Sequence, residues 1–528
     1  MSQKRALISV FNKEEVVEFA KNLENLGWEI VSTGGTSRFL KRAGIKVTPI
    51  EKITGRSEIL DGRVKTIAYQ IAAGLLFDRK KPKHRAEIKK SNIKPIDMVV
   101  CSLYPFEKTV SGKHSLEEAV EMIDIGGVTL LRAAAKNYEY VTVVTDPKYY
   151  PLILRELEKV GEVSLETKKR LASKVFWKVA DYDAAIDVYL AKRFCQEEII
   201  KLNFCEGKKL RYGENPHLAG WFYKTQDPAD PLAISDFKFL QGKEVSFNNT
   251  LDISAAIDLI CEIGQEKPSC AILKHGSPCG AATKDSIHQA YHSAWYEGDP
   301  LAAFGGIVIV NRLVDEKLAR KMLFDRGQKK FFEVLLAPKV EVAALNFFGE
   351  RKNLIILENP TLEKPKIRKA FDFKFVRGGI LKGDFDSKVI SEKDLKIVSK
   401  QRPTKKQIED LLFAFKIVKA SRSNAVAIAK NQTLISSGVG QQDRKEACKL
   451  AVFKSADPSR GKSQQTAIGA VAASDGFFPF ADGPEILIKA GIKAIIQPGG
   501  SLRDQETINL CNRHKVALVF TGVRAFKH

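Results

Sequence analysis

Strand-like and helix-like segments alternate through the first 150 residues, and this alternation constrains the fold more than any other feature. Short buried strands are expected at 6–10, 28–31, 98–101 and 141–144. The apolar spacing predicts helices at 14–26, 37–43 and 128–136. Strands separated by helices in this way favour a parallel sheet with helices packed on its faces.

A long helical pattern follows the alternating region. Leu171, Val175 and Val179 repeat every four residues within 166–193, which predicts one long helix. The next stretch, 195–210, is charged and lacks strong periodicity. We therefore expect a domain boundary near residue 200.

The rest of the chain mixes short strands and helices. Helices are expected at 405–418 and 484–490, and strands at 425–428, 494–496 and 517–520. The polar, basic segment 351–374 is interpreted as a surface excursion. The 528 residues suggest three or four domains at about 150 residues each. With a second boundary near residue 385, the expected domains are 1–198, 199–385 and 386–528.

Composition and charge exclude several classes of protein. Apolar residues make up 44% and charged residues 28%, which excludes a mostly disordered or low-complexity chain. The formal net charge of +22 attracts anions, whether nucleic acid, membrane surface or phosphorylated substrate. No apolar run approaches the roughly 18 residues of a membrane span, and no signal-peptide pattern is found. Eight scattered cysteines without a CxxC pair favour reduced thiols, so a cytoplasmic location is expected.

Two basic or glycine-containing strings in the N-terminal part suit anion binding. The string STGGT (32–36) lies between a strand and a helix, where backbone N–H groups bind phosphate well. A tight turn with a threonine cap explains it equally well. In GRVKT (62–66), Arg63 and Lys65 point the same way in an extended segment and could clamp an oxyanion. The alternative is a solvated basic pair.

Two further strings combine charge with irregular backbone. Asp124 stands beside a Gly-Gly helix start, with Lys136 later in the same helix, and this pair suits proton transfer and charge stabilisation. A helix cap with a surface lysine is the alternative. The string LRYGENPH (210–217) is dense in polar residues, and its Arg211 is suited to phosphate, although a loop alone also explains it.

The C-terminal half holds the remaining candidates. A buried strand delivers Lys274 and His275 into a Gly/Pro loop, where His275 could act as a general base and Lys274 could hold an oxyanion. A structural histidine is the alternative. The aromatic string FFPF (477–480) could wall an aromatic ligand or belong to the core. The Pro-Gly-Gly turn at 498–500 permits close backbone approach to a ligand.

Two other features are not interpreted as sites. His288 and His292 lie one helical turn apart, but no third ligand has a recognisable spacing, so no metal is expected. The basic segment 79–90 lacks interleaved aromatic residues and matches no nucleic-acid-binding pattern. A solvated face is therefore the better interpretation, and neither nucleic acid nor membrane is expected as a partner.

The order and joint presence of these strings resemble a known family. The chain is similar, end to end, to bifunctional purine-biosynthesis proteins with phosphoribosylaminoimidazolecarboxamide (AICAR) formyltransferase and IMP cyclohydrolase activities. The N-terminal strings that carry the resemblance are STGGT, GRVKT, LYPF (103–106) and IDIGGVTLLRAAAKN (123–137). The C-terminal ones are LRYGENPH, FNNTLD (247–252), LKHGSPCGAA, AFGG (303–306), SNAVAIAKN (423–431), FFPF, IIQPGGSLRD (495–504) and VFTGVR.

The resemblance implies an α/β fold and two reactions. The expected architecture is a methylglyoxal-synthase-like, Rossmann-type domain followed by two cytidine-deaminase-like α/β/α subdomains. The first reaction transfers a formyl group from 10-formyltetrahydrofolate, a co-substrate, to AICAR. The second closes the ring of formyl-AICAR with loss of water to give IMP. The resemblance also implies a homodimer and no metal.

The resemblance assigns roles residue by residue. In formyl transfer, His275 matches the proton acceptor, beside Lys274 and with Asn424 as a polar partner. Nucleotide contacts there match Arg211, Tyr212, Asn249, Gly305, Glu333 and Arg524, and folate contacts match Arg444, Phe477 and Asp482. The cyclohydrolase catalytic group matches Lys65, Tyr104, Asp124 and Lys136. Its nucleotide pocket matches Ser9, Lys13, Ser32, Gly34, Gly35, Thr36, Arg63, Thr66, Gly126 and Gly127.

The chain departs from the family pattern near the cyclohydrolase strings. Phe11-Asn12 replace Ser-Asp, Ala68-Tyr69 replace His-Pro, and Ser102 replaces Asn. Ala302 and Ala481 replace Ser and Arg in the other half. One alternative is therefore a formyltransferase with a weakened cyclohydrolase, and another is an N-terminal nucleotide-sensing domain. A nucleic-acid-binding protein driven by charge is the third alternative, and a steep salt dependence would favour it.

Overall fold

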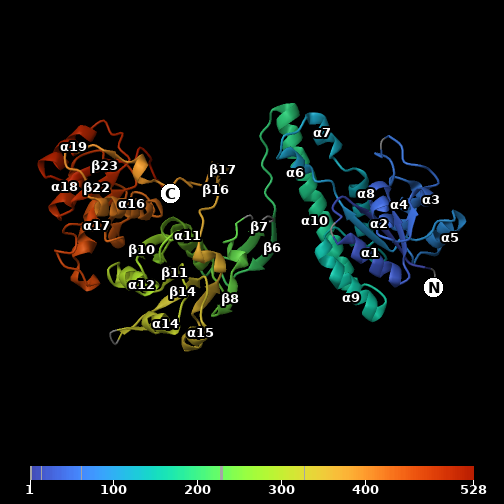
Figure 1. Ribbon diagram of the computed structural model, residues 1–528, viewed down its shortest axis with the longest axis horizontal. Helices are drawn as coiled ribbons and strands as arrows, with labels where there is room; N and C mark the ends of the chain where they lie inside the picture. The colour runs from blue at the N-terminus through green and yellow to red at the C-terminus, as the bar shows by residue number, and fades with distance from the viewer. Residues whose placement is uncertain (1–2, 14, 61, 226–229, 326–327) are drawn as a thin grey trace. The chain divides into compact units, whose positions relative to one another are not determined.

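A computed structural model describes residues 3–13, 15–60, 62–225, 230–325 and 328–528. The chain divides into two compact units, an N-terminal unit of residues 1–203 and a C-terminal unit of residues 204–528. Figure 1 shows both units and labels many of their helices and strands. Among the described residues, no helix combines the length and apolar character needed to cross a membrane.

The N-terminal unit is built on a parallel sheet in the order β3-β2-β1-β4-β5. Its strands are β1 (Arg5–Val10), β2 (Glu29–Ser32), β3 (Val47–Pro49), β4 (Met98–Ser102) and β5 (Thr142–Val144). Its helices are α1 (Val16–Asn25), α2 (Gly34–Arg42), α3 (Glu51–Thr54), α4 (Tyr69–Leu76), α5 (Pro82–Lys90), α6 (Phe106–Val110), α7 (Leu116–Glu121), α8 (Gly126–Lys136), α9 (Tyr150–Val160) and α10 (Leu165–Leu190). This confirms the α/β class expected from the alternation.

Successive residues of a strand point to opposite faces of the sheet, so alternate residues pack into two separate cores. Ile8 of β1 packs on one face with Phe19 of α1 and Ile153 of α9. Leu7 packs on the other face with Leu131 of α8 and Val175 of α10. Because the strand order reverses at β1, the carboxyl ends of β1 and β4 border a crevice, the usual place for a ligand in an open parallel sheet.

Several boundaries differ from the sequence expectations. Helix α2 begins at Gly34, not at residue 37, so both glycines of STGGT lie in its first turn. The long helix ends at Leu190 and continues as a π-helical turn, Ala191–Cys195. Glu14, where the first helix was expected to begin, lies outside the described residues. The basic segment 79–90 forms the exposed helix α5, which has no buried residue.

The C-terminal unit is built on a twelve-stranded mixed sheet in the order β18-β23-β22-β21-β19-β20-β10-β9-β11-β14-β15-β8. These strands are β8 (Lys238–Gln241), β9 (Ser269–Lys274), β10 (Ser277–Thr283), β11 (Gly306–Val310), β14 (Phe332–Ala337), β15 (Ile355–Glu358), β18 (Lys396–Ile397), β19 (Val426–Lys430), β20 (Thr433–Gly438), β21 (Val471–Ser474), β22 (Ala494–Gln497) and β23 (Ala517–Phe520). Two-stranded ribbons add β6 (Phe204–Lys209) with β7 (Trp221–Thr225), β12 (Phe324–Asp325) with β13 (Gln328–Lys329), and β16 (Phe371–Val376) with β17 (Gly379–Asp384).

Helices cover both faces of this sheet. They are α11 (Phe247–Ile263), α12 (Ile287–Tyr296), α13 (Pro300–Ala303), α14 (Glu316–Leu323), α15 (Val342–Phe348), α16 (Lys405–Lys419), α17 (Arg444–Ala456), α18 (Asp482–Lys489) and α19 (Asp504–Arg513). Helices α11 and α16 share one core on one face. Helices α12, α14 and α15 pack on the other face of one half of the sheet, and α17 to α19 on that of the other half.

One expectation for this unit is wrong. The segment 351–374 is not only a surface excursion, because it contains β15, whose Ile355, Ile356 and Leu357 are buried in the central sheet. The charged residues on either side of this short apolar run conceal it in the sequence. The boundary near residue 385 stays a prediction, since the two halves of the sheet share a continuous core.

We predict that residues 1–203, expressed alone, fold as a cooperative unit. The fragment contains a complete sheet with a separate core on each face, and a domain of this size can support its own fold. Thermal unfolding followed by circular dichroism should give a single transition. An insoluble fragment, with the full chain soluble under the same conditions, would contradict this division.

Candidate active sites

The carboxyl ends of β1 and β2 bring the first group of expected residues together. Ser9 Oγ lies 3.1 Å from Thr33 Oγ1, and Ser32 Oγ donates to the Ile8 carbonyl at 2.6 Å. The Thr36 hydroxyl accepts from the Val10 N–H at 3.2 Å and donates to the Val10 carbonyl at 2.9 Å. The hydroxyls of STGGT therefore fasten this loop to β1.

The first turn of α2 offers backbone N–H groups at the same edge. Thr33 is the N-cap, but its side chain makes no capping hydrogen bond, so the interpretation of the string as a threonine-capped turn is wrong. A side chain at Gly34, where φ is +32°, would approach the Glu58 carboxylate at 3.4 Å. Glu58 was not expected from the sequence, because it lies in an irregular stretch with no motif.

Glycines at the start of α8 permit close packing around Asp124. A Cβ at Gly126 would lie 2.7 Å from Thr66 Oγ1, and one at Gly127 would lie 2.5 Å from Asp124 Oδ2. The Gly127 N–H donates to Asp124 Oδ1 at 2.7 Å. The close approach explains why Gly occupies both positions. Thr66, Asp124 and both glycines are thus brought together.

Burial raises the pKa of Asp124 above its ordinary value. The N–H groups of Gly127 and Tyr104 and the ammonium of Lys65 act in the opposite direction, by stabilising the carboxylate. Burial is the largest of these influences, so the net effect on the pKa of Asp124 is upward despite the nearby lysine.

Tyr182 of α10 hydrogen-bonds to the backbone of Asp124, and the sequence did not indicate this role. Its hydroxyl accepts from the Asp124 N–H at 2.8 Å and donates to the Met122 carbonyl at 2.6 Å. Burial raises the pKa of Tyr182 to about 12, so the hydroxyl keeps its proton at neutral pH. Its apolar helical spacing in the sequence indicated only a core residue.

The departures at Phe11 and Ser102 contact each other. Ser102 Oγ accepts from the N–H groups of Phe11 at 2.8 Å and Asn12 at 3.3 Å. The Phe11 ring packs edge-on against Tyr104, with ring centroids 5.7 Å apart, and Lys13 Nζ donates to the Phe11 carbonyl at 3.4 Å. Tyr104 and Lys13 thus both contact Phe11, which directly follows β1.

Lys136 and Arg63 are not placed as the sequence predicts. Lys136 is exposed at the far end of α8, and a rise of 1.5 Å per residue separates it from Gly126 by about 15 Å. The expectation that it flanks Asp124 is therefore corrected by helix geometry. Arg63 is exposed and forms a surface ion pair with Glu121, which a bound phosphate would have to replace.

In the C-terminal unit, Lys274 and His275 stand at the end of β9, as expected for a strand end. Lys274 Nζ donates to the Phe304 carbonyl at 2.7 Å. A Cβ at Gly305, where φ is +75°, would lie 3.9 Å from Lys274 Nζ. Gly305 and Lys274 therefore share one small region.

A second group gathers at the start of α11. Asn249 Nδ2 donates to Glu333 Oε2 at 3.4 Å, and Lys243 forms an ion pair with the same carboxylate at 3.0 Å. Asn248 Nδ2 donates to the Glu214 carbonyl at 3.0 Å, which ties the LRYGENPH loop to α11. In that loop the Arg211 guanidinium stands over the Tyr212 ring at 5.3 Å. These contacts link the expected nucleotide residues of 210–217, α11 and β14.

Asn424 is held by a buried ion pair. Arg444 donates from Nη2 to Asn424 Oδ1 at 2.6 Å and from Nη1 to both Ser474 Oγ and the completely buried Asp475 carboxylate. Asn424 Nδ2 donates to the carbonyls of Gln441 and Gln442 at 2.9 and 3.1 Å. Because carbonyls only accept and guanidinium only donates, the amide has one orientation, and Oδ1 can accept one further hydrogen bond.

Two further contacts involve residues 422 and 423, which lead to Asn424. The nearest atom to a Cβ at Gly276 would be Arg422 Nε, at 3.9 Å, so the turn after β9 lies beside the segment that leads to Asn424. Ser423 Oγ donates to Asp475 Oδ2 at 2.6 Å. Asp475 stands two residues before the FFPF string and was given no role of its own, and Arg422 was missed, because neither has a spacing that distinguishes it from an ordinary charged residue.

The remaining expected residues, Phe477, Asp482 and Arg524, lie in the C-terminal part of the chain. Arg524 is exposed over the Phe526 ring at 4.5 Å, and Arg444 stands over the same ring at 5.7 Å. Phe477 is 40% exposed, and Asp482 at the start of α18 pairs with Lys445 at 3.2 Å. Phe526 thus connects Arg524 with the Arg444 network.

Within the described ranges, no group of three or more His, Cys, Asp or Glu side chains is arranged to hold a metal ion. His288, one of the two histidines considered, instead contacts Asp315 at 2.9 Å. All eight cysteines are free thiols.

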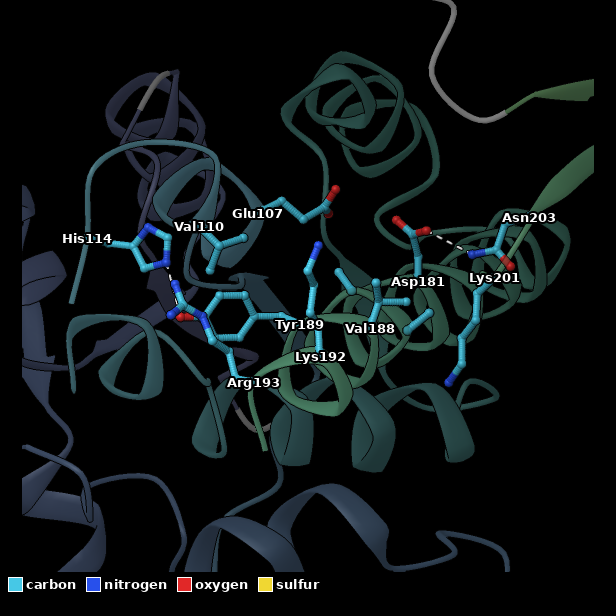
Figure 2. A pocket seen from close by; sticks show the side chains of 12 residues that line it. Glu107, Val110, His114, Asp181, Val188, Tyr189, Lys192, Arg193, Lys201 and Asn203 are labelled. Atoms are coloured by element: carbon cyan, nitrogen blue, oxygen red, sulfur yellow. Dashed lines mark hydrogen bonds between the residues drawn. The ribbon is translucent and has the colours of Figure 1, made fainter. Parts of the chain in front are cut away.

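A cavity of about 760 Å³ in the N-terminal unit is lined by none of the expected residues. It lies beside α6 and the end of α10, and Figure 2 shows its side chains. His114 is hydrogen-bonded to the Tyr189 hydroxyl at 3.0 Å, and Asn203 donates to Asp181 at 2.9 Å. Since these polar groups pair with one another, volume alone does not make this cavity the reaction site.

Comparison with known proteins identifies the family. A family model described as "AICARFT/IMPCHase bienzyme" matches residues 134–454, and one described as "MGS-like domain" matches residues 15–129. "Bifunctional purine biosynthesis protein PurH" of Acetivibrio thermocellus is 44% identical over 99% of this chain and 100% of its own length. The chain belongs to the AICARFT/IMPCHase bienzyme family.

Further relatives agree. Proteins with the same name from Caldicellulosiruptor saccharolyticus and Anoxybacillus flavithermus are 44% and 43% identical, over 99% and 100% of this chain and the full length of each relative. The chain is thus a bifunctional enzyme of purine biosynthesis, with AICAR formyltransferase and IMP cyclohydrolase activities. This confirms the resemblance and the two activities inferred from the motifs.

We predict that Asp475→Ala lowers the free energy of unfolding by about 3 to 5 kcal/mol, the usual result of leaving one member of a buried ion pair alone. Arg444 is 7% exposed and cannot regain water without disrupting the site. Urea denaturation measures the change. Asp285→Asn is the control, because Asp285 is 89% exposed and its ion pair with Lys267 lies at the surface, so little change is expected. A small loss at Asp475 would show that the pair adds no stability.

Proposed function

We propose that each unit carries one of the two reactions. Formyl transfer takes place around Lys274, His275 and Asn424 of the C-terminal unit, and ring closure around Lys65, Tyr104 and Asp124 of the N-terminal unit. The observation that carries this division is that each group is gathered within a single unit. Tyr104 and Lys65 both act on Asp124, and the segment that leads to Asn424 lies beside the turn that follows Lys274 and His275. The division accounts for both activities without a shared catalytic residue.

In formyl transfer, the AICAR amine is a weak nucleophile and needs a base as it attacks the formyl carbon. His275 accepts the amine proton, and the Lys274 ammonium stabilises the oxyanion that develops on the formyl oxygen. Asn424 Oδ1 accepts a hydrogen bond from an N–H group, because its two donors are already used. The C–N bond to the folate then breaks, and the leaving nitrogen of tetrahydrofolate takes up the proton that His275 accepted.

The other expected residues bind the two substrates. Arg211, Tyr212, Asn249, Gly305, Glu333 and Arg524 contact the nucleotide. Phe477, Asp482 and Arg444 contact the reduced folate, with 10-formyltetrahydrofolate as co-substrate. Arg444 has most of its donors committed to Asp475, Ser474 and Asn424, so its main effect is on the shape of the site. A homodimer belongs to this proposal, and the exposure of Leu301 and Phe304 beside Lys274 supports it.

In ring closure, the carboxamide nitrogen of formyl-AICAR attacks the formyl carbon. Asp124 accepts the nitrogen proton, and its burial-raised pKa makes it a stronger base than an exposed carboxylate. Lys65 stabilises the oxyanion, and loss of water completes the ring. Ser9, Lys13, Ser32, Gly34, Gly35, Thr36, Arg63, Thr66, Gly126 and Gly127 hold the nucleotide. Lys136 stays a predicted residue, without a place beside Asp124.

The full chain incubated with AICAR and 10-formyltetrahydrofolate tests the division. IMP should form, and chromatography of the products measures it. Accumulation of formyl-AICAR without IMP would support the alternative of a weakened cyclohydrolase or a nucleotide-sensing N-terminal unit. The contact between Phe11 and Ser102 is the observation that keeps this alternative worth testing.

We predict that His275→Ala lowers the rate of formyl transfer by roughly 10²-fold or more, as expected when a general base is removed. Cyclisation of supplied formyl-AICAR should be unchanged, because that reaction uses the other unit. Separate assays of the two half-reactions measure this. Near-normal transfer would make His275 a structural residue.

We predict that Lys65→Leu lowers kcat for ring closure by about 10² to 10³-fold, the usual effect of losing an oxyanion donor. It should also move the acid limb of the pH–rate profile to higher pH. The Lys65 cation lowers the pKa of Asp124, so its removal raises that pKa further, and the ionised base then appears only at higher pH.

Lys136→Leu is the matched control for that pH shift. It removes the same charge from the same unit, but about one helix length away from Asp124. The acid limb of its pH–rate profile should lie at the same pH as in the unmodified enzyme. If both substitutions move the limb equally, net charge and not a local contact with Lys65 sets the titration of Asp124.

A further inference from the structure

The turn after β9 has a backbone conformation that its sequence does not favour. His275 has φ of +53° and Gly276 has φ of +71°, so two consecutive residues are left-handed. Glycine adopts this region freely, but a histidine pays a steric penalty there. A further interaction must hold His275 in place.

Asp252 of α11 supplies that interaction. Its Oδ1 accepts from the Gly276 N–H at 2.6 Å, and its Oδ2 accepts from the His275 N–H at 3.3 Å. Within the part of the chain that is described, the Asp252 carboxylate has no other hydrogen bond or ion pair. Its charge is therefore directed entirely at the backbone of this turn.

The His275 side chain, in contrast, is free. It is exposed, and its ring has no hydrogen-bond partner among the described residues. Because no described residue hydrogen-bonds to the imidazole, the backbone of the turn sets the direction in which it leaves the main chain. One turn earlier on α11, Asn249 contacts Glu333. The same helix thus fixes both the turn and an expected nucleotide contact.

An equivalent clamp occurs in the other half of the sheet. The turn between β19 and β20 places Asn431 and Gln432 at φ of +54° and +51°. Their N–H groups donate to Asp410 of α16 at 2.9 and 2.5 Å. Lys274-His275-Gly276 and Lys430-Asn431-Gln432 therefore have the same backbone arrangement. Only the first carries a histidine, so the chain offers a structural copy of the clamp without the catalytic group.

We propose that Asp252 is a positioning residue for formyl transfer. By binding both N–H groups of the turn, it holds His275 in the left-handed conformation from which the imidazole reaches the AICAR amine. This proposal rests on the proposed role of His275. Asp252 itself touches neither substrate and transfers no proton.

The test compares Asp252→Ala, Asp252→Asn and Asp252→Glu with the unmodified full-length enzyme. Asp252→Ala should lower kcat for formyl transfer by about 10-fold or more while KM for AICAR and for 10-formyltetrahydrofolate changes less than threefold, the pattern of a transition-state effect. Asp252→Asn, which keeps the size and one acceptor, should be intermediate. Asp252→Glu should restore part of the rate. Across the pH range, the plateau of the rate should fall while the shape of the profile stays the same.

Asp410→Ala is the matched control. It removes the same clamp from a turn without a catalytic residue, so it should lower the melting temperature without lowering kcat for formyl transfer. Equal loss of kcat in the Asp252 and Asp410 variants would assign both carboxylates a structural role only and overturn the proposal. A profile that moves along the pH axis with an unchanged plateau would also overturn it.

The results separate this proposal from the function on which it rests. If the unmodified enzyme transfers no formyl group, the proposed function fails. If it does so and Asp252→Asn, the nearly isosteric variant, matches it in kcat, the positioning role alone fails. Should Asp252→Ala not fold, Asp252→Asn and Asp252→Glu still decide the question.

Discussion

Complete burial of the strands is the constraint on which both sites depend. Ile8 at the centre of the N-terminal sheet and Ile272 in β9 are both fully buried, and each strand leads directly into site residues. Close packing resists displacement of such strands, so the residues that follow them start from a well-defined position. A loop at the end of a rigid strand can then hold polar groups that the core itself excludes.

Two carboxylates show how burial serves different purposes in the two units. Asp475 is completely buried, and it has the guanidinium of Arg444 and the hydroxyl of Ser423 as partners. It shapes the site without needing to exchange a proton. The carboxylate of Asp124 is stabilised by two backbone N–H groups and by the charge of Lys65. These lower its pKa less than burial raises it, so the net shift of the pKa is upward. A carboxylate with a raised pKa gains basicity, and the same burial that costs stability makes proton transfer easier.

Much of the N-terminal sheet, and most of the site strings, could be predicted from the sequence. Periodicity identified β1, α1 and α10, because a single repeating pattern decides each of them. It failed at β15, whose short apolar run lies between charged residues, and at the start of α2, where glycines conceal a helical turn. The rise per residue of a helix already predicts that Lys136 lies far from Asp124, but the motif was interpreted as placing the two residues close together.

Positioning residues were harder to predict than reacting ones. Tyr182, Asp252 and Asp475 act through hydrogen bonds to backbone or to other side chains, and such contacts join residues 23 to 58 positions apart in the chain. No spacing rule indicates a contact of this kind. The roles given to the reacting residues stay predictions, since the geometry brings most of them together but shows no reaction.

The paired clamps of Asp252 and Asp410 suggest how one turn acquired chemistry. Asparagine and histidine both occupy the left-handed conformation more readily than most residues, so each turn begins with a residue that tolerates it. The Asn431 N–H lies closer to its carboxylate than the His275 N–H does, at 2.9 against 3.3 Å. The histidine turn thus has the longer bond, and the glycine at 276 compensates by accepting a left-handed conformation at no steric cost, where the other turn has Gln432. A fold that already clamps such a turn can carry a strained histidine at its tip, which an unclamped loop could not hold in one orientation.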